Sequence, residues 1–140
     1  MKTVIGVVVG TCAVALVAAA ALGKAPLLVL PTPWGVGLIG VAMLAVLAQP
    51  SAARSARTAA VGLATVGSAG AVVAWVAWLR GFSHDNAVGG APDAIDSMVD
   101  LGSSTAALAL AALLVIAGSA SSMPGRDRPD AETTPLNAGA

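Results

Sequence analysis

Four long apolar stretches make up most of the chain, and charged residues are absent from the interior of each one. They cover residues 4–22, 33–49, 59–79 and 103–120. A helix rises about 1.5 Å per residue, so about 17–25 apolar residues cross the roughly 30 Å core of a bilayer. Each stretch reaches that length. The pattern therefore predicts an all-α integral membrane protein with four transmembrane helices in an up-down bundle.

Polar segments divide the rest of the chain. We expect residues 1–123 to form one transmembrane domain and residues 124–140, which are rich in Pro, Gly, Thr and charged residues, to form a disordered tail. The longest connection, 80–102, is predicted to be an outer acidic loop. After Pro92 its pattern becomes helical, which favours a short amphipathic helix on the membrane surface or an early start of the fourth helix.

The basic residues predict the orientation, because Lys and Arg of short loops collect on the cytoplasmic side. Lys24 and Arg80 fall on one side of the predicted bundle and five basic residues on the other. The five are Lys2, Arg54, Arg57, Arg126 and Arg128. Trp34, Trp75 and Trp78 would lie at the outer interface, where amphipathic rings prefer to sit. We therefore expect a multi-pass protein of the cell membrane with both termini in the cytoplasm.

Arg54 and Arg57 lie between the second and third apolar stretches. Their long side chains are expected to reach the lipid headgroups at the inner interface. The first stretch has an alternative interpretation as a cleaved signal peptide, because a lysine precedes it and small residues, Ala18–Ala21, end it. Its length of about 19 residues exceeds the usual 7–15 apolar residues of a signal peptide, which favours a retained helix.

Small residues recur in the first and third stretches at spacings that place them on shared helix faces. In lipid, such residues let two helix backbones approach closely. The candidate packing residues are Gly6 and Gly10 in the first stretch and Gly62, Ser68, Gly70 and Ala74 in the third. We expect these faces to pack within the bundle, against a protein partner or against a second copy of the chain.

Candidate chemistry is confined to the segment 80–102. Asp93, Asp96 and Asp100 would share a helix face near His84, and carboxylates are ligands that divalent cations bind. A helical row spreads such carboxylates over about 10 Å, which favours a solvated acidic face instead of a metal site. Cys12 is the only cysteine, so no intrachain disulfide can form. No catalytic residue and no cofactor is expected.

Composition narrows the possible functions. The chain is 57% hydrophobic and 10% charged with no net charge, which argues against a nucleic-acid partner. Abundant Ala, an excess of Arg over Lys and the lack of Tyr indicate a high-GC bacterial genome. The apolar stretches lack the ionisable residues on which ion-coupled transporters depend.

The expected role is a non-enzymatic accessory or scaffold subunit of a bacterial inner-membrane complex, of the envelope or respiratory type. It would bind a protein partner or a second copy through faces rich in small residues. Two alternatives remain open. One is a homo-oligomeric pore-forming or holin-like protein, and the other is a membrane sensor or enzyme that uses the outer acidic loop.

Overall fold

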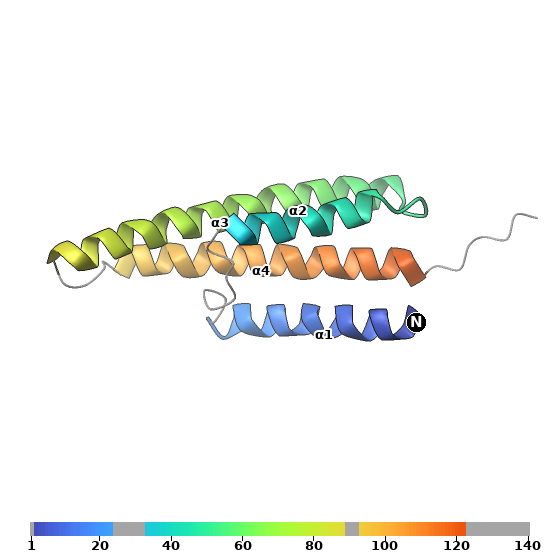
Figure 1. The fold of residues 1–140 in the computed structure, drawn as a ribbon, viewed down its shortest axis with the longest axis horizontal. Coiled ribbons are helices and arrows are strands. Elements are labelled where there is room, and N and C mark those ends of the chain that lie inside the picture. Colours follow the sequence, from blue (N-terminus) through green and yellow to red (C-terminus); the bar gives the residue numbers. More distant parts are fainter. Residues whose placement is uncertain (1, 24–32, 89–92, 123–140) are drawn as a thin grey trace, which may run out of the picture.

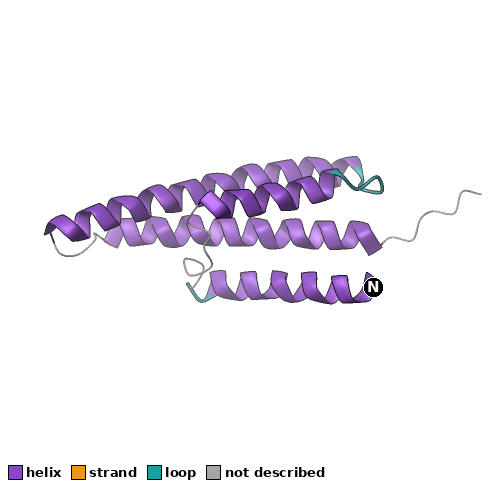
Figure 2. Cartoon of the chain, in the orientation of Figure 1, coloured by secondary structure: helices purple, strands orange, loops and turns teal. Residues whose placement is uncertain are grey.

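The computed structural model describes residues 2–23, 33–88 and 93–122, which form four α-helices (Figure 2). These are α1 (Lys2–Ala21), α2 (Pro33–Leu47), α3 (Arg54–Val88) and α4 (Asp93–Ser122). The helices α1, α3 and α4 are long and apolar enough to cross a membrane, whereas α2 is shorter, with 15 residues. The predicted disordered tail, 124–140, lies outside the described residues.

Successive helices run in opposite directions, so the start of α1 and the end of α4 lie at the same end of the molecule (Figure 1). Helix α4 contacts α1 on one side and both α2 and α3 on the other, and α2 and α3 also contact each other. Within the described residues, α1 contacts α4 alone. The arrangement is therefore a three-helix bundle of α2, α3 and α4 to which α1 is attached along α4.

The core of the three-helix bundle consists mainly of alanines. Ile39 and Val46 of α2 and Leu113 of α4 are its fully buried large side chains. The alanines of the cluster are Ala42, Ala60, Ala64, Ala71, Ala106 and Ala107. Because a methyl group takes little space, α3 and α4 lie close together, and the larger side chains of α2 fill the space beside them.

Local sequence explains where the helices end and begin. Gly23 adopts a φ of 62° after α1, and its N–H donates to the carbonyl oxygen of Ala20 at 3.3 Å. This left-handed conformation favours glycine and is a common way to end a helix. Helix α2 ends before Pro50, which lacks an N–H to donate. Helix α4 begins at Asp93, directly after Pro92, and an acidic residue there favours a helix N-terminus.

Two helices are longer than the apolar pattern predicts. The predicted span 59–79 corresponds to the central part of α3, and the predicted span 103–120 corresponds to the C-terminal two-thirds of α4. Most of the predicted outer loop 80–102 is therefore helical, with the fourth helix starting early. The apolar pattern marks only the residues that lipid can cover. A helix can continue through polar residues as long as one of its faces packs against a neighbouring helix. Gly81 and Val99 are buried along these extensions.

Helix α2 is shorter than the predicted span 33–49. At about 1.5 Å per residue its 15 residues rise about 22 Å, less than the roughly 30 Å of a bilayer core. After Leu47 the N–H of Ala48 donates to Leu44 and that of Gln49 donates to Val46, at 2.9 and 3.2 Å. The hydrogen bonds at the end of α2 thus change from an i→i−4 to an i→i−3 spacing before the chain continues toward α3.

Candidate functional site

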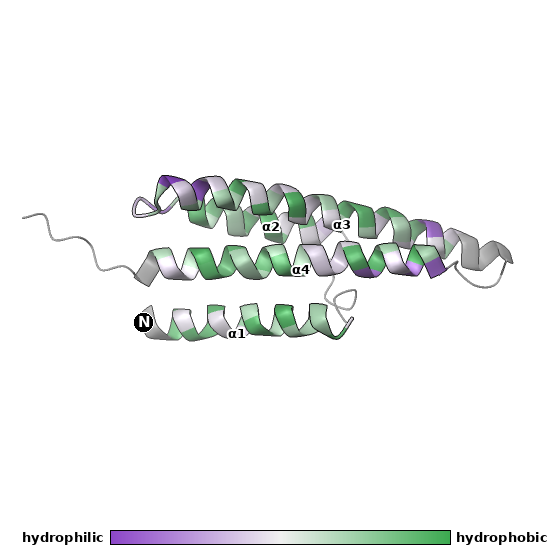
Figure 3. Ribbon diagram, turned by 180° about the vertical axis from the view of Figure 1, so that it is seen from behind, coloured by the Kyte–Doolittle hydropathy of each residue, from purple (hydrophilic) through white to green (hydrophobic). Residues whose placement is uncertain are grey.

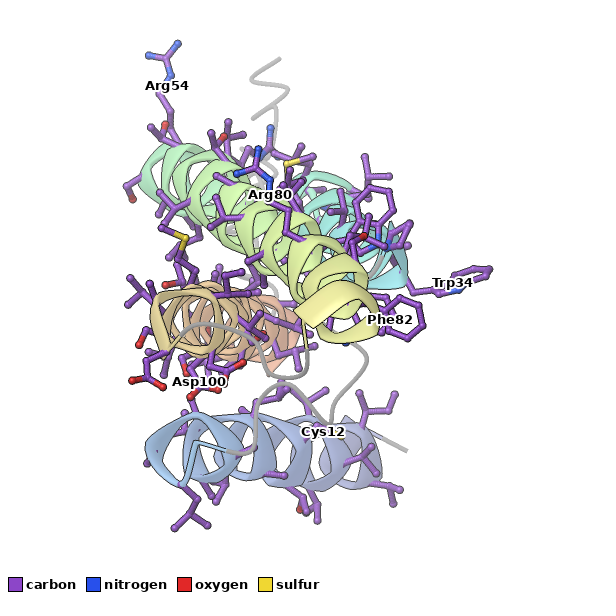
Figure 4. All side chains as sticks on the ribbon, turned by 90° about the vertical axis from the view of Figure 1, so that its left-hand side faces the viewer. Cys12, Trp34, Arg54, Arg80, Phe82 and Asp100 are labelled. Carbon is purple, nitrogen blue, oxygen red and sulfur yellow. The ribbon has the colours of Figure 1, made fainter. Side chains whose placement is uncertain are left out.

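The predicted acidic face is an exposed side of the first turns of α4. Asp93, Asp96 and Asp100 are all exposed, and Figure 4 shows Asp100 on the side of α4 that is turned toward α1. His84 belongs to the last turns of α3, and its side chain lies outside the described part of the structure. In that described part, no three side chains of His, Cys, Asp or Glu are grouped to hold a metal ion.

Helices α3 and α4 approach each other very closely at Gly70 and Gly102. A Cβ atom added to Gly102 would lie 2.5 Å from the carbonyl oxygen of Gly70 and 2.9 Å from the Cβ of Ala74. One added to Gly70 would lie 2.8 Å from the carbonyl oxygen of Gly102. One added to Gly67 would lie 2.6 Å from the Cβ of Ala109. Glycine is therefore required at these crossing points.

Gly70 and Ala74 thus lie in the contact between α3 and α4. Gly67 and Gly102 lie there too, although neither is among the packing residues predicted from the sequence. The spacing of Gly67, Gly70 and Ala74 at i, i+3 and i+7 is the signal that identifies this face. Helical spacing could not identify Gly102, because the sequence predicts the segment 80–102 to be a loop.

The remaining candidate packing residues lie elsewhere. Gly6 and Gly10 on α1 and Gly62 on α3 are exposed, and a Cβ atom added to any of them would meet no neighbouring atom within 4 Å. Ser68 is half-buried. These three glycines therefore present small, uncovered surfaces to whatever surrounds the chain.

The three tryptophans lie at similar levels along the bundle, near the start of α2. Trp34 is 75% exposed at the start of α2, Trp75 is half-buried and Trp78 is 48% exposed. Ile39 faces Gly67, and α2 and α3 are antiparallel, so Trp34 lies near the level of residue 72 on α3. With a rise of about 1.5 Å per residue, Trp34, Trp75 and Trp78 are within about 10 Å of one another along the helix axes.

The turn between α2 and α3 packs on the end of α4 through side-chain hydrogen bonds. The Nε2 of Gln49 donates to the carbonyl oxygen of Ala117 at 3.0 Å, and the Oγ of Ser51 donates to that of Ala120 at 3.1 Å. The carbonyl of Ala120 belongs to the last four of the helix, which lack an intrahelical donor. These contacts join segments far apart in the sequence, and the sequence carries no signal for them.

The two arginines at the start of α3 are both exposed but differ in their contacts. Arg57 is exposed, and its Nη2 donates to the carbonyl oxygen of Gln49 at 3.0 Å. Arg54 is also exposed and extends away from the helices (Figure 4). Hydrophilic residues gather at the start of α3 and again at the first turns of α4 and the neighbouring part of α3, and the ribbon between is mostly apolar (Figure 3).

Two apolar grooves lie along α4. The first, here called the α1–α4 groove, has a volume of about 680 Å³. Its lining includes Ala13, Val17 and Ala18 of α1 and Leu108, Ala112 and Val115 of α4. Gly6 and Gly10 lie on the same face of α1 as Ala13 and Val17, at i, i+4, i+7 and i+11. A continuous face of small and aliphatic residues thus runs along α1 beside the groove.

The second groove, here called the α3–α4 groove, has a volume of about 450 Å³. Its lining includes Val72, Val73, Val76 and Arg80 of α3 and Ile95 and Met98 of α4. Arg80 is the one charged side chain among the described residues that line either groove. The pattern of basic residues predicts only that Arg80 lies on the outer side of the membrane, and no sequence signal predicts either groove.

Comparison with known protein families, with curated proteins and with solved structures finds no match for this chain. Its function must therefore be inferred from the surfaces themselves. An apolar groove bordered by small residues can bind an apolar helix or a lipid chain. A cationic side chain at the end of such a groove can bind an anionic group.

Proposed function

We propose that this chain is a multi-span membrane protein that acts as a non-catalytic accessory or scaffold subunit of a larger membrane complex. The α1–α4 groove would receive an apolar helix of the partner. The observation that carries this proposal is the groove itself, an apolar depression of about 680 Å³ bordered by small residues of α1 and α4.

The position of α1 supports this role. Only 6% of its apolar span is buried by the rest of the chain. Val4, Val7 and Val14 are among its exposed side chains, and Val14 is 70% exposed. A helix that contacts a single neighbour leaves most of its perimeter for other molecules.

Packing in lipid supports a helix as the occupant of the groove. Apolar side chains gain little by leaving lipid for protein, so helices associate through close van der Waals contact, which small residues permit. Ala13 and Ala18 on α1 and Ala112 on α4 leave an open depression between the two helices, and Gly6 and Gly10 add exposed small residues to the same face of α1. A ridge of larger side chains on a partner helix would fill this space.

The distribution of polar residues supports an orientation. The start of α1, the end of α4 and the arginines at the start of α3 lie at one end of the molecule, and the tryptophans lie toward the other. Basic residues favour the cytoplasmic side. We therefore place both termini in the cytoplasm, with the helices in the inner membrane of a bacterium.

A pair of matched substitutions tests the docking surface. Ala18→Phe would fill the α1–α4 groove, whereas Ala15→Phe adds the same ring to an exposed alanine of α1 that lines neither groove. The tagged wild-type chain and both variants would be purified in mild detergent from their native membrane, and the co-purifying chains identified and quantified.

We expect the wild-type chain and Ala15→Phe to retain a partner at a fixed stoichiometry, and Ala18→Phe to lose at least tenfold of it. A partner retained equally by both variants would contradict docking in the groove. A chain that purifies only with copies of itself would contradict the subunit role and support the pore-forming alternative.

A further inference from the structure

The α3–α4 groove combines an apolar wall with a single cation. Valines of α3 together with Ile95 and Met98 of α4 form the wall, and Arg80 lines the groove on the last part of α3. Arg80 is exposed, and it makes no ion pair with any other described residue. Among the described residues, nothing therefore holds the guanidinium away from a ligand that lies along the groove.

The acidic residues of α4 do not compensate this charge. Ile95 and Met98 face the groove, whereas Asp93, Asp96 and Asp100 occupy the opposite side of α4 at about 100° per residue. Figure 4 agrees, because Asp100 lies on the side of α4 turned toward α1 and Arg80 projects from α3 on the other side. The described lining of the groove thus carries one positive charge, although the chain has no net charge overall.

The position of Arg80 along α3 matches a headgroup level. Arg57 and Arg80 are separated by 23 residues, or about 35 Å of helix, which lies between the roughly 30 Å of the bilayer core and the 40–45 Å that includes the headgroups. From Val72 to Arg80 the groove extends about 12 Å along the helix. It therefore leads from the apolar level of the bundle to the headgroups on the side opposite Arg57.

We propose that the α3–α4 groove binds a phospholipid with an anionic headgroup. The phosphate would accept hydrogen bonds from the guanidinium of Arg80, a geometry that Arg favours. The glycerol backbone and the upper part of an acyl chain would lie against the valines, Ile95 and Met98. An anionic lipid fits better than phosphatidylcholine, whose choline cation would lie close to Arg80. The inference rests on the membrane insertion that the proposed function assumes.

Lipid retention tests the proposal. The full chain would be reconstituted into vesicles of equal parts dioleoyl phosphatidylcholine and dioleoyl phosphatidylglycerol, extracted in mild detergent, and its bound lipids quantified. One cation near the surface contributes about 1 kcal/mol, so we expect phosphatidylglycerol to be enriched about fivefold over the vesicle ratio. Arg80→Gln should return the ratio close to that of the vesicles, and Arg80→Lys should retain most of the enrichment.

Two further variants separate the groove from general charge attraction. Arg54→Gln removes an exposed arginine that lines neither groove, and it should keep the full enrichment. Ala94→Phe keeps Arg80 but adds a ring to an exposed alanine in the groove, and it should lower the retained phosphatidylglycerol. Equal losses in Arg54→Gln and Arg80→Gln, or unchanged retention in Ala94→Phe, would overturn the proposal.

A wash of the vesicles at alkaline pH distinguishes the two ways of failing. If the chain stays with the vesicles but retains both lipids at the vesicle ratio, lipid binding is overturned and insertion stands. If alkaline carbonate extracts the chain, insertion itself fails, and the proposed function fails with it.

Discussion

Because two facing glycines lack a side chain, α3 and α4 can pack closely. The backbones meet where Gly70 and Gly102 face each other, and each glycine lies too close to the opposite carbonyl oxygen for a Cβ atom. Backbone carbonyl groups of helices cannot move aside as a flexible side chain can. A larger residue there must therefore separate the helices and disturb the alanine contacts on both sides of the crossing.

Replacing Gly70 with Leu should destabilise the bundle. Overpacked cores lose about 1–3 kcal/mol, and contact with a rigid backbone places Gly70→Leu at the upper end of this range. The free energy of unfolding would be measured by titrating the detergent-solubilised chain with sodium dodecyl sulfate. Gly62→Leu is the matched control, because Gly62 is an exposed glycine of the same helix with open space around it.

Gly62→Leu should leave the unfolding free energy nearly unchanged or raise it slightly, since Leu is a better helix former than Gly. A stability of Gly70→Leu that is unchanged from the wild-type chain would show that α3 and α4 do not cross at Gly70. A similar loss in both would indicate instead that α3 is covered on its Gly62 face as well.

Among the helices, α1 differs from the others in how it is held. Helices α2, α3 and α4 each contact two or more neighbours, whereas α1 lies along α4 alone within the described residues. Its contact with α4 includes Val9, whose Cγ1 would lie 3.3 Å from a Cβ atom added to Gly118. The two helices are antiparallel, so this one contact defines the register of α1 along α4.

A disulfide between positions 9 and 118 tests this register. A Cβ atom at residue 118 would lie 4.0 Å from the Cβ of Val9, and disulfides join Cβ atoms that are about 3.5–4.5 Å apart. On a Cys12→Ala background, Val9→Cys with Gly118→Cys should oxidise almost completely in the membrane, as detected by mass after alkylation. Val8→Cys with Gly118→Cys should oxidise little, because Val8 is exposed and points elsewhere.

Efficient oxidation of the 8–118 pair with poor oxidation of the 9–118 pair would show that α1 is rotated about its axis. Failure of both pairs in a folded chain would show that α1 does not lie on this face of α4. In that case the α1–α4 groove would not exist in the membrane, and the proposed docking surface would be lost with it.

The whole molecule has unequal ends. Helices α3 and α4 project beyond the ends of α1 and α2 on the side where Arg80 and the acidic face lie (Figure 1). The three long helices are long and apolar enough to cross a bilayer, whereas α2 is about 8 Å shorter than a 30 Å core. A short helix is accommodated by local thinning of the bilayer or by flanking residues that reach the interface, and Trp34 is placed for such a contact.

Reporter fusions test the orientation at this scale. If α2 crosses the membrane and α1 is retained, a fluorescent protein fused to either terminus should fold in the cytoplasm. A phosphatase that is active only outside the cytoplasm should work when it is inserted at residues 89–92, between α3 and α4. A phosphatase that is active at the C-terminus and inactive at residues 89–92 would reverse the proposed orientation.

The sequence by itself determines the helices of this protein. Apolar length predicts the three long helices, and Pro50 and Pro92 mark boundaries that the structure has, because proline removes a backbone donor in any context. Helices α3 and α4 extend past the apolar spans because polar residues continue them, and for α4 this early start is one of the two arrangements that the sequence predicts. Hydrophobicity indicates which residues lipid can cover, but it does not indicate where the backbone hydrogen bonds of a helix end.

Only the tertiary structure decides which helices touch and which surfaces remain open. The crossing at Gly70 and Gly102, the bonds from Gln49 and Ser51 to the end of α4, and the groove beside Arg80 all join segments distant in the sequence. In a chain so rich in Gly and Ala, small residues occur on many helix faces, so their spacing alone does not select a neighbour. That choice depends on the simultaneous fit of several helices, which is a property of the packed bundle.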